Sequence, residues 1–103
     1  MNNDRVSGLL GICRKAGKLS LGHDESKISV KNGSASLCIL SSDSSQRLKE
    51  EFFALCKDAK IEAITVPYST EQFAFIVGSK AAVVTVNDEG FRKKLMTYRE
   101  DNI

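Results

Sequence analysis

Apolar positions along the chain switch repeatedly between the 3.6-residue period of a helix face and the alternating or continuous runs of a strand. The first helical stripe recurs at i, i+3, i+4 and i+7 and consists of Val6, Leu9, Leu10 and Cys13. Asn3 or Asp4 can cap the start of this helix, and Gly17 ends it. Residues 18–21 then alternate polar and apolar side chains. The chain therefore opens with a helix and a short strand that ends at Gly22.

The middle of the chain repeats this order. A polar, weakly amphipathic helix is predicted from His23 or Asp24 to Lys31, and Asn32-Gly33 is typical of a helix end. Residues 37–40 are continuously apolar, as in a strand covered on both faces. Residues 41–45 supply turn and N-cap side chains for the next helix. The core face expected for that helix is Leu48, Phe52, Leu55, Cys56 and Ala59.

The last part of the chain predicts two further strand–helix pairs. A strand over residues 61–66 is closed by Pro67, and residues 69–72 fit a capping box that opens a helix ending at Gly78. A strand over residues 82–86 follows, and Asn87 or Asp88 can cap the final helix. Alternating helices and strands require crossovers that place helices on both sheet faces. We therefore predict an α/β fold, a single-domain three-layer α/β/α sandwich with a central four-stranded mixed sheet.

Composition narrows the class of protein. The 103 residues suit one domain, and 42% apolar with 27% charged residues is ordinary for a globular chain. The formal net charge of +2 excludes a disordered polyelectrolyte. No run reaches the roughly 20 apolar residues of a membrane span, and residues 1–5 lack the apolar segment of a secretory signal. We expect a cytoplasmic protein without a membrane partner.

Candidate catalytic and metal-binding residues are few. Cys13, Cys38 and Cys56 are odd in number, widely spaced and placed at apolar positions, which favours reduced core thiols over a zinc site. His23 is the single histidine, and its nearest acid in sequence, Asp24, is one residue away, where helical side chains do not normally face each other. We therefore expect a solvated His23, no catalytic centre, no metal, no cofactor and no small-molecule substrate.

Charge is unevenly distributed. Residues 1–36 hold six bases and three acids, whereas residues 37–103 hold nine bases and ten acids. The excess of positive charge in the first segment hints at an anionic partner. The five Phe residues are expected on core stripes, and the sequence holds no Trp, so no base-stacking platform is predicted.

Four stretches are similar to a known family. They are Arg14-Lys-Ala-Gly-Lys-Leu-Ser-Leu-Gly22, Leu37-Cys-Ile-Leu-Ser-Ser-Asp43, Val77-Gly-Ser-Lys-Ala-Ala-Val-Val84 and Asn87-Asp-Glu-Gly-Phe91. Over essentially its whole length the chain resembles the kink-turn RNA-binding family of large-subunit ribosomal proteins, and more closely the small bacterial YlxQ-type members. The resemblance implies one α/β/α domain over residues 1–103 that binds RNA bent sharply at a bulge beside tandem sheared G·A pairs.

The resemblance also implies where RNA is contacted, namely the loop and helix after the first strand and a second loop before the last strand. Gly22 matches the family's glycine and Glu25 its glutamate. The full set of expected RNA-binding residues is Arg14, Lys18, Gly22, His23, Asp24, Glu25, Lys27, Ile28, Lys31, Ser79, Lys80, Ala81 and Ala82. The expected protein is a ribosome-associated monomer whose partners are kink-turn RNA, such as ribosomal RNA, and ribosomal proteins.

Two positions depart from the family pattern. Asp24 replaces an asparagine and cannot donate to guanine acceptors, and Ile28 replaces a lysine. Lys27 lies about 100° around the helix from Ile28, so it cannot point the same way. If Val30 packs inward, Ile28 is exposed, since the two lie about 200° apart. The alternative function is a ribosome- or complex-associated protein-interaction module with weakened or lost kink-turn readout.

Overall fold

Helices and strands alternate along the whole of the described chain. The computed structural model describes residues 4–101. The elements are α1 (Arg5–Lys15), β1 (Leu19–Leu21), α2 (His23–Lys31), β2 (Leu37–Leu40), α3 (Gln46–Ala59), β3 (Glu62–Thr65), α4 (Thr70–Val77), β4 (Val83–Val86) and α5 (Glu89–Asp101). This order confirms the predicted alternation, although β3 and β4 are each shorter than the predicted strands.

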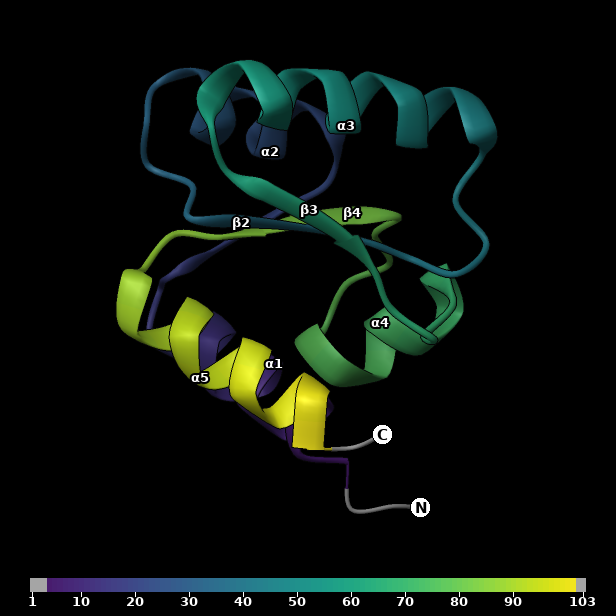
Figure 1. The fold of residues 1–103 in the computed structure, drawn as a ribbon. Helices are drawn as coiled ribbons and strands as arrows, with labels where there is room; N and C mark the ends of the chain where they lie inside the picture. Colours follow the sequence, from purple (N-terminus) through teal and green to yellow (C-terminus); the bar gives the residue numbers. More distant parts are fainter. Residues whose placement is uncertain (1–3, 102–103) are drawn as a thin grey trace.

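The four strands form one mixed sheet in the order β1-β4-β2-β3. β4 is antiparallel to both of its neighbours, with Leu21 opposite Val84 and Leu40 opposite Val83, whereas β2 and β3 are parallel. Figure 1 shows α2 and α3 covering one face of the sheet and α1, α4 and α5 covering the other. The predicted three-layer α/β/α sandwich with a mixed four-stranded sheet is therefore confirmed.

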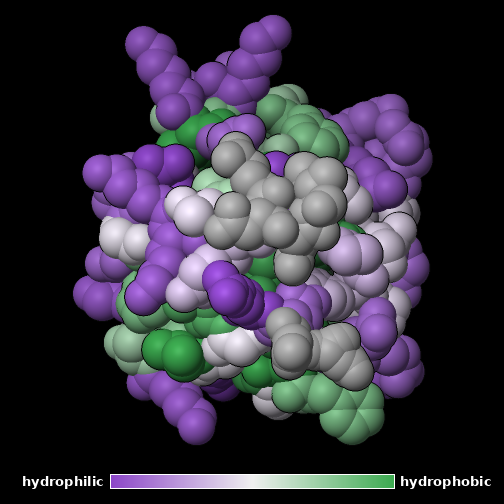
Figure 2. Space-filling view, turned by 60° about the horizontal axis from the view of Figure 1, so that its bottom comes forward, coloured by the Kyte–Doolittle hydropathy of each residue, from purple (hydrophilic) through white to green (hydrophobic). Residues whose placement is uncertain are grey.

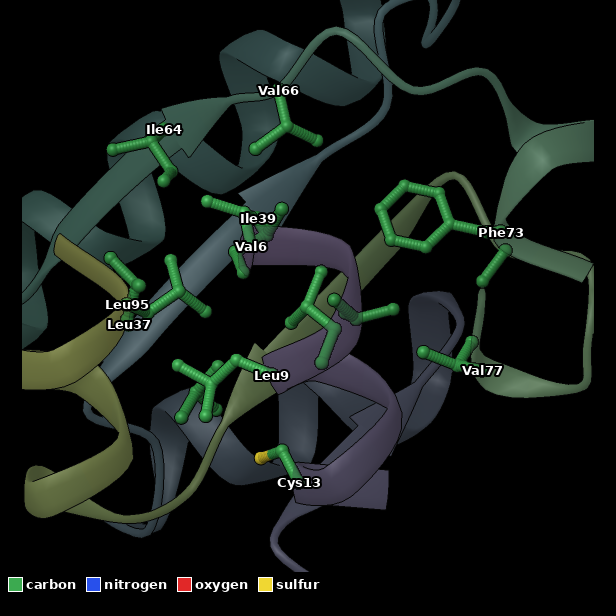
Figure 3. Close-up of a cluster of buried hydrophobic side chains, with 14 residues drawn as sticks. Val6, Leu9, Cys13, Leu37, Ile39, Ile64, Val66, Phe73, Val77 and Leu95 are labelled. Atoms are coloured by element: carbon green, nitrogen blue, oxygen red, sulfur yellow. The ribbon is translucent and has the colours of Figure 1, made fainter. Parts of the chain in front are cut away.

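The core consists of two clusters, one on each face of the sheet. Val6, Leu9 and Cys13 of α1 pack towards the sheet together with Phe73 and Val77 of α4 (Figure 3). On the other face Val30 packs with Phe52 and Cys56 of α3. β2 is fully buried because alternate residues point to opposite clusters, which explains its continuous apolar run. All three cysteines are free and buried, as predicted.

The helix caps follow the predicted polar residues. The Asp4 side chain accepts a hydrogen bond from the Val6 N–H at 3.1 Å, Ser69 and Gln72 form the capping box, and Asp88 accepts from the Phe91 N–H. Asn3, the other residue proposed to cap α1, lies outside the described residues. None of the described helices is long and apolar enough to cross a bilayer.

Two predictions about side-chain burial are wrong. Ala59 is exposed at the end of α3 and does not belong to its core face. Phe53 and Phe75 are 43% and 89% exposed, although all phenylalanines were expected on core stripes. Helix geometry is the reason, because Phe53 lies about 100° from the buried Phe52 and Phe75 about 200° from the buried Phe73.

Candidate nucleic-acid interface

Gly22 forms the junction between β1 and α2. It is the N-cap residue of α2 with φ 88° and ψ 174°, a backbone conformation that favours glycine. Its N–H donates to the Val83 carbonyl at 2.9 Å, and its carbonyl accepts from the Ser26 N–H. A Cβ at this position would meet no atom within 4 Å, so the space around the junction is open. The first turn of α2 is thus held at the start of β4.

The loop of residues 78–82 reaches the same place from the other side. α4 ends at Gly78, which is left-handed with φ 84° and ψ 8°, and the loop then enters β4 at Val83. Because Val83 accepts from the Gly22 N–H, this loop and the start of α2 lie side by side. Ser79 and Lys80 are exposed there. The structure therefore brings together the two segments that the resemblance assigns to RNA.

The last two residues of this loop, Ala81 and Ala82, hold it against the rest of the protein. Ala81 is buried in the cluster on the α1–α4–α5 side of the sheet, so its side chain is closed to a ligand. The Ala82 carbonyl accepts a hydrogen bond from the Ser41 N–H at 2.9 Å. These two alanines anchor the loop, while Ser79 and Lys80 present side chains to solvent.

The predicted phosphate-binding bases are spread over the molecule. The Arg14 Nε donates to the Val77 carbonyl at 3.2 Å, which places its guanidinium beside the end of α4. The Lys18 carbonyl accepts from the Asn87 N–H. Lys18 directly precedes β1, whereas Gly22 directly follows it, so the two residues lie at different ends of this strand. Lys31 is the last residue of α2, about 12 Å along the helix axis from its start. Lys18 and Lys31 are therefore distant from the Gly22 junction.

His23 sits in a network of charged groups at the start of α2. Its Nε2 lies 2.9 Å from the Glu51 carboxylate of α3 and its Nδ1 lies 3.2 Å from Asp24. Lys27 also reaches Glu51, at 3.6 Å. The hydrogen bond to Glu51, and then that to Asp24, raises the pKa of His23 above its usual value, and the bond to His23 lowers the pKa of Glu51.

His23 is exposed at the start of α2, as expected, but the expectation that the neighbouring Asp24 faces away from it is wrong. Half-exposed His23 packs edge-on against the Phe52 ring, with centroids 5.5 Å apart, and is held between two carboxylates. Glu51 was not a predicted site residue. Its only indication in the sequence was its place outside the core stripe of α3, and the contact depends on how α2 and α3 pack.

The two departures from the family pattern are both at the surface. Asp24 is 95% exposed at its side chain, and Glu25 beside it is exposed. Ile28 is 57% exposed and Val30 is buried, as predicted. Lys80 pairs with Glu71 at 3.2 Å. The start of α2 therefore presents carboxylates and an apolar side chain, and its nearest bases are already paired.

Comparison with known proteins places this arrangement in a family. The family model described as the Ribosomal protein L7Ae/L30e/S12e/Gadd45 family matches residues 4–96. A Bacillus halodurans protein of unknown function is similar in structure, with TM-score 0.89 and 27% identity over 95% of this chain and 99% of that one. The Giardia lamblia 15.5kD RNA binding protein has TM-score 0.75 and 14% identity over 98% of this chain and 90% of that one, which is a likeness of fold.

A search of the curated proteins finds no match to this sequence. The family model nevertheless covers most of the described residues, including α2 and the loop of residues 78–82. The chain belongs to the Ribosomal protein L7Ae/L30e/S12e/Gadd45 family.

Proposed function

We propose that the chain is a non-catalytic RNA-binding protein that recognises kink-turn-type RNA and acts with the ribosome in the cytoplasm. The observation that carries this proposal is the hydrogen bond from the Gly22 N–H to the Val83 carbonyl, which joins the start of α2 to the loop before β4. Membership of a ribosomal protein family and the fold shared with a protein described as RNA-binding support it.

The start of α2 supplies the chemistry for reading the RNA. The first N–H groups of a helix have no partners within it and favour phosphate oxygens. Glu25, exposed in this first turn, would accept hydrogen bonds from the amino and imino groups of a guanine in a sheared G·A pair. Ser79 and Lys80 would cover the bulged nucleotides from the neighbouring loop. Readout and positioning would thus come from two adjacent segments.

The bases around this site would neutralise phosphates. Lys27 lies one turn into α2, Lys80 lies in the neighbouring loop and Arg14 lies beside the end of α4. Lys18 and Lys31 would meet only an RNA that extends beyond the junction. If three or more phosphates are neutralised, the logarithm of the binding constant should fall with the logarithm of salt concentration at a slope of at least about −2 to −3. The protein would then bind with a clear but moderate salt dependence.

A second function is favoured by one observation, the exposure of Ile28 on α2. An apolar side chain in place of a lysine suits contact with a protein, such as a ribosomal protein, better than contact with a groove of RNA. In this alternative the fold is retained and kink-turn readout is weakened or lost. The proposed subtype, a bacterial YlxQ-type member, fits either function.

The proposal is tested by titrating the full chain into two RNAs of the same length. One carries a kink-turn with its G·A pairs, and in the other these pairs are changed to Watson–Crick pairs. Tighter binding of the first supports kink-turn recognition. Equal affinity for both contradicts it, and co-sedimentation of the protein with ribosomal subunits that persists in an Asp24→Asn variant but is lost in Ile28→Ala and Ile28→Lys variants would then favour the protein-contact alternative.

A further inference from the structure

An open groove lies between α1 and α4, next to the loop of residues 78–82. Its volume is about 440 Å³. The residues that shape it are Gly8, Gly11, Ile12, Arg14, Lys15 and Phe75. Among the described residues Phe75 is the most exposed of the large apolar side chains at 89%, and Ile12 is 58% exposed. Neither side chain is buried in the core, so both are available to contact a ligand in the groove.

Two glycines of α1 shape the groove. A Cβ at Gly11 would lie 3.3 Å from the Ile76 carbonyl oxygen, so glycine allows α1 and α4 to approach closely. A Cβ at Gly8 would meet nothing within 4 Å, so packing does not require glycine there. Glycine inside a helix is about 1 kcal/mol less favourable than alanine. Gly8 therefore lowers the stability of α1 while leaving the floor of the groove free of side chains.

The charges at the groove are basic. Arg14 and Lys15 are its charged lining residues, and both belong to the last turn of α1. The hydrogen bond from the Arg14 Nε to the Val77 carbonyl fixes that guanidinium at the rim. Glu71, one turn before Phe75 on α4, is paired with Lys80. An exposed aromatic ring beside two basic side chains suits an anionic ligand with a flat apolar part.

The groove continues directly into the proposed RNA site. Val77 and Gly78 line its end, and Gly78 begins the loop that lies against Gly22. A protein partner would need an interface of roughly 1,000 Å² with an apolar centre. On the side of the molecule seen in Figure 2, apolar side chains reach the surface in small patches among hydrophilic ones. One ring and one isoleucine match a single nucleotide better than a protein.

We infer that an unpaired nucleotide of the bound RNA stacks its base on the Phe75 ring, with its phosphates at Arg14 and Lys15. This inference rests on the proposed RNA binding and adds a second contact surface, on α1 and α4, to the one on α2. Stacking on an aromatic side chain tolerates any base. The groove therefore adds affinity for RNA that carries unpaired nucleotides, and the start of α2 provides the selection for G·A pairs.

The test measures binding of the full chain to the kink-turn RNA and to the same RNA with abasic sugars at its unpaired positions. Phe75→Ala should weaken binding of the first RNA by about 5- to 100-fold, the usual range for one lost stack, and should hardly change binding of the second. Phe75→Trp should keep the wild-type affinity. Phe53→Ala is the matched control, because this exposed phenylalanine lies on α3.

A groove-filling variant tests the same surface without removing a contact. Gly8→Leu changes a position where an added Cβ would meet nothing within 4 Å, so it should leave the fold at least as stable while weakening RNA binding as Phe75→Ala does. If neither variant weakens binding while the wild type still prefers the intact G·A pairs, the stacking inference is wrong and the proposed function stands. If both weaken binding but the G·A pairs make no difference, the groove binds RNA and kink-turn recognition fails.

Discussion

The candidate interface has two halves, the start of α2 and the α1–α4 groove. They differ in the sign of their charge and in whether their charged side chains already form ion pairs. At the start of α2, Asp24 and Glu25 are exposed, and His23 and Lys27 are bound to Glu51 of α3. At the α1–α4 groove the charged lining residues are Arg14 and Lys15, and neither forms an ion pair within residues 4–99. One half offers acceptors and the other offers cations and an aromatic ring.

This difference separates selectivity from affinity. Carboxylates beside phosphates oppose binding unless they accept hydrogen bonds from base edges, so the start of α2 favours only an RNA that presents donors there. Basic side chains and an exposed aromatic ring favour nearly any RNA that offers phosphates and an unpaired nucleobase. Changes at α2 should therefore alter the choice of RNA, and changes at α1 and α4 should alter the strength of binding.

The largest expected effect compares two phenylalanines of α4. Phe73 is fully buried and packs edge-on against Tyr68, whereas Phe75 projects into solvent. Phe73→Ala should lower the free energy of unfolding by about 3–5 kcal/mol, the usual loss for a buried phenylalanine. Phe75→Ala should leave stability nearly unchanged and weaken RNA binding. Urea unfolding of both variants checks the first result, and an equal loss of stability in both would contradict the assignment of Phe75 to a ligand surface.

A gain of affinity is expected from restoring the family pattern on α2. Asp24→Asn with Ile28→Lys should tighten kink-turn binding about tenfold, corresponding to roughly 1.4 kcal/mol, and should tighten binding of the G·A-altered RNA much less. The control is Asp58→Asn with Ala59→Lys, which adds the same charge at the end of α3. Similar gains in affinity from both double variants would show that only net charge determines binding, and would contradict the separate roles of the two halves.

A smaller effect is expected at Lys80, which belongs to the loop between the two halves. Lys80→Ala removes one phosphate contact, so it should weaken binding of every RNA alike and reduce the salt slope by about one. Its pair with Glu71 is exposed, so stability should change by less than about 1 kcal/mol. Titrations at several salt concentrations measure the slope. An unchanged slope would place Lys80 outside the interface.

The smallest effect concerns the protonation of His23. Because Glu51 and Asp24 raise its pKa, the ion pair stabilises the fold fully below about pH 6.5, the ordinary histidine value, and is lost as pH rises through the raised pKa. Glu51→Gln removes the main cause and should return the pKa towards its ordinary value. His23 is the single histidine, so an NMR titration of its ring follows it directly. A wild-type pKa at or below 6.5 would contradict this network.

The fold was largely predictable from the sequence because its patterns agree with each other. Continuous apolar residues in β2, the capping box at Ser69 and Gln72, and the glycines after α1 and α4 each mark an element or its end. The predictions that failed concern which apolar side chains of a helix are buried. Phe53 and Phe75 are apolar, but each lies too far around its helix from the core stripe to be buried. Ala59 is in phase with Phe52 and is exposed because it is the last residue of α3.

The site was only partly predictable. Gly22, Glu25 and the loop of residues 78–82 follow from the resemblance to the family, and the exposure of Ile28 follows from its angle to Val30. The contact between His23 and Glu51 does not, because it depends on which helices share a sheet face. The groove at Phe75 does not either, since it requires α1 and α4 to cross at Gly11. Both are contacts between elements distant in sequence.

The central claim is that this family member still selects kink-turn RNA through the start of α2 although Asp24 and Ile28 depart from the family pattern. The most direct test is the titration of the wild-type chain into RNA with intact G·A pairs and into RNA with those pairs changed, at one fixed salt concentration. Binding at least tenfold tighter to the intact kink-turn is the predicted result. Equal affinity for the two RNAs would contradict it.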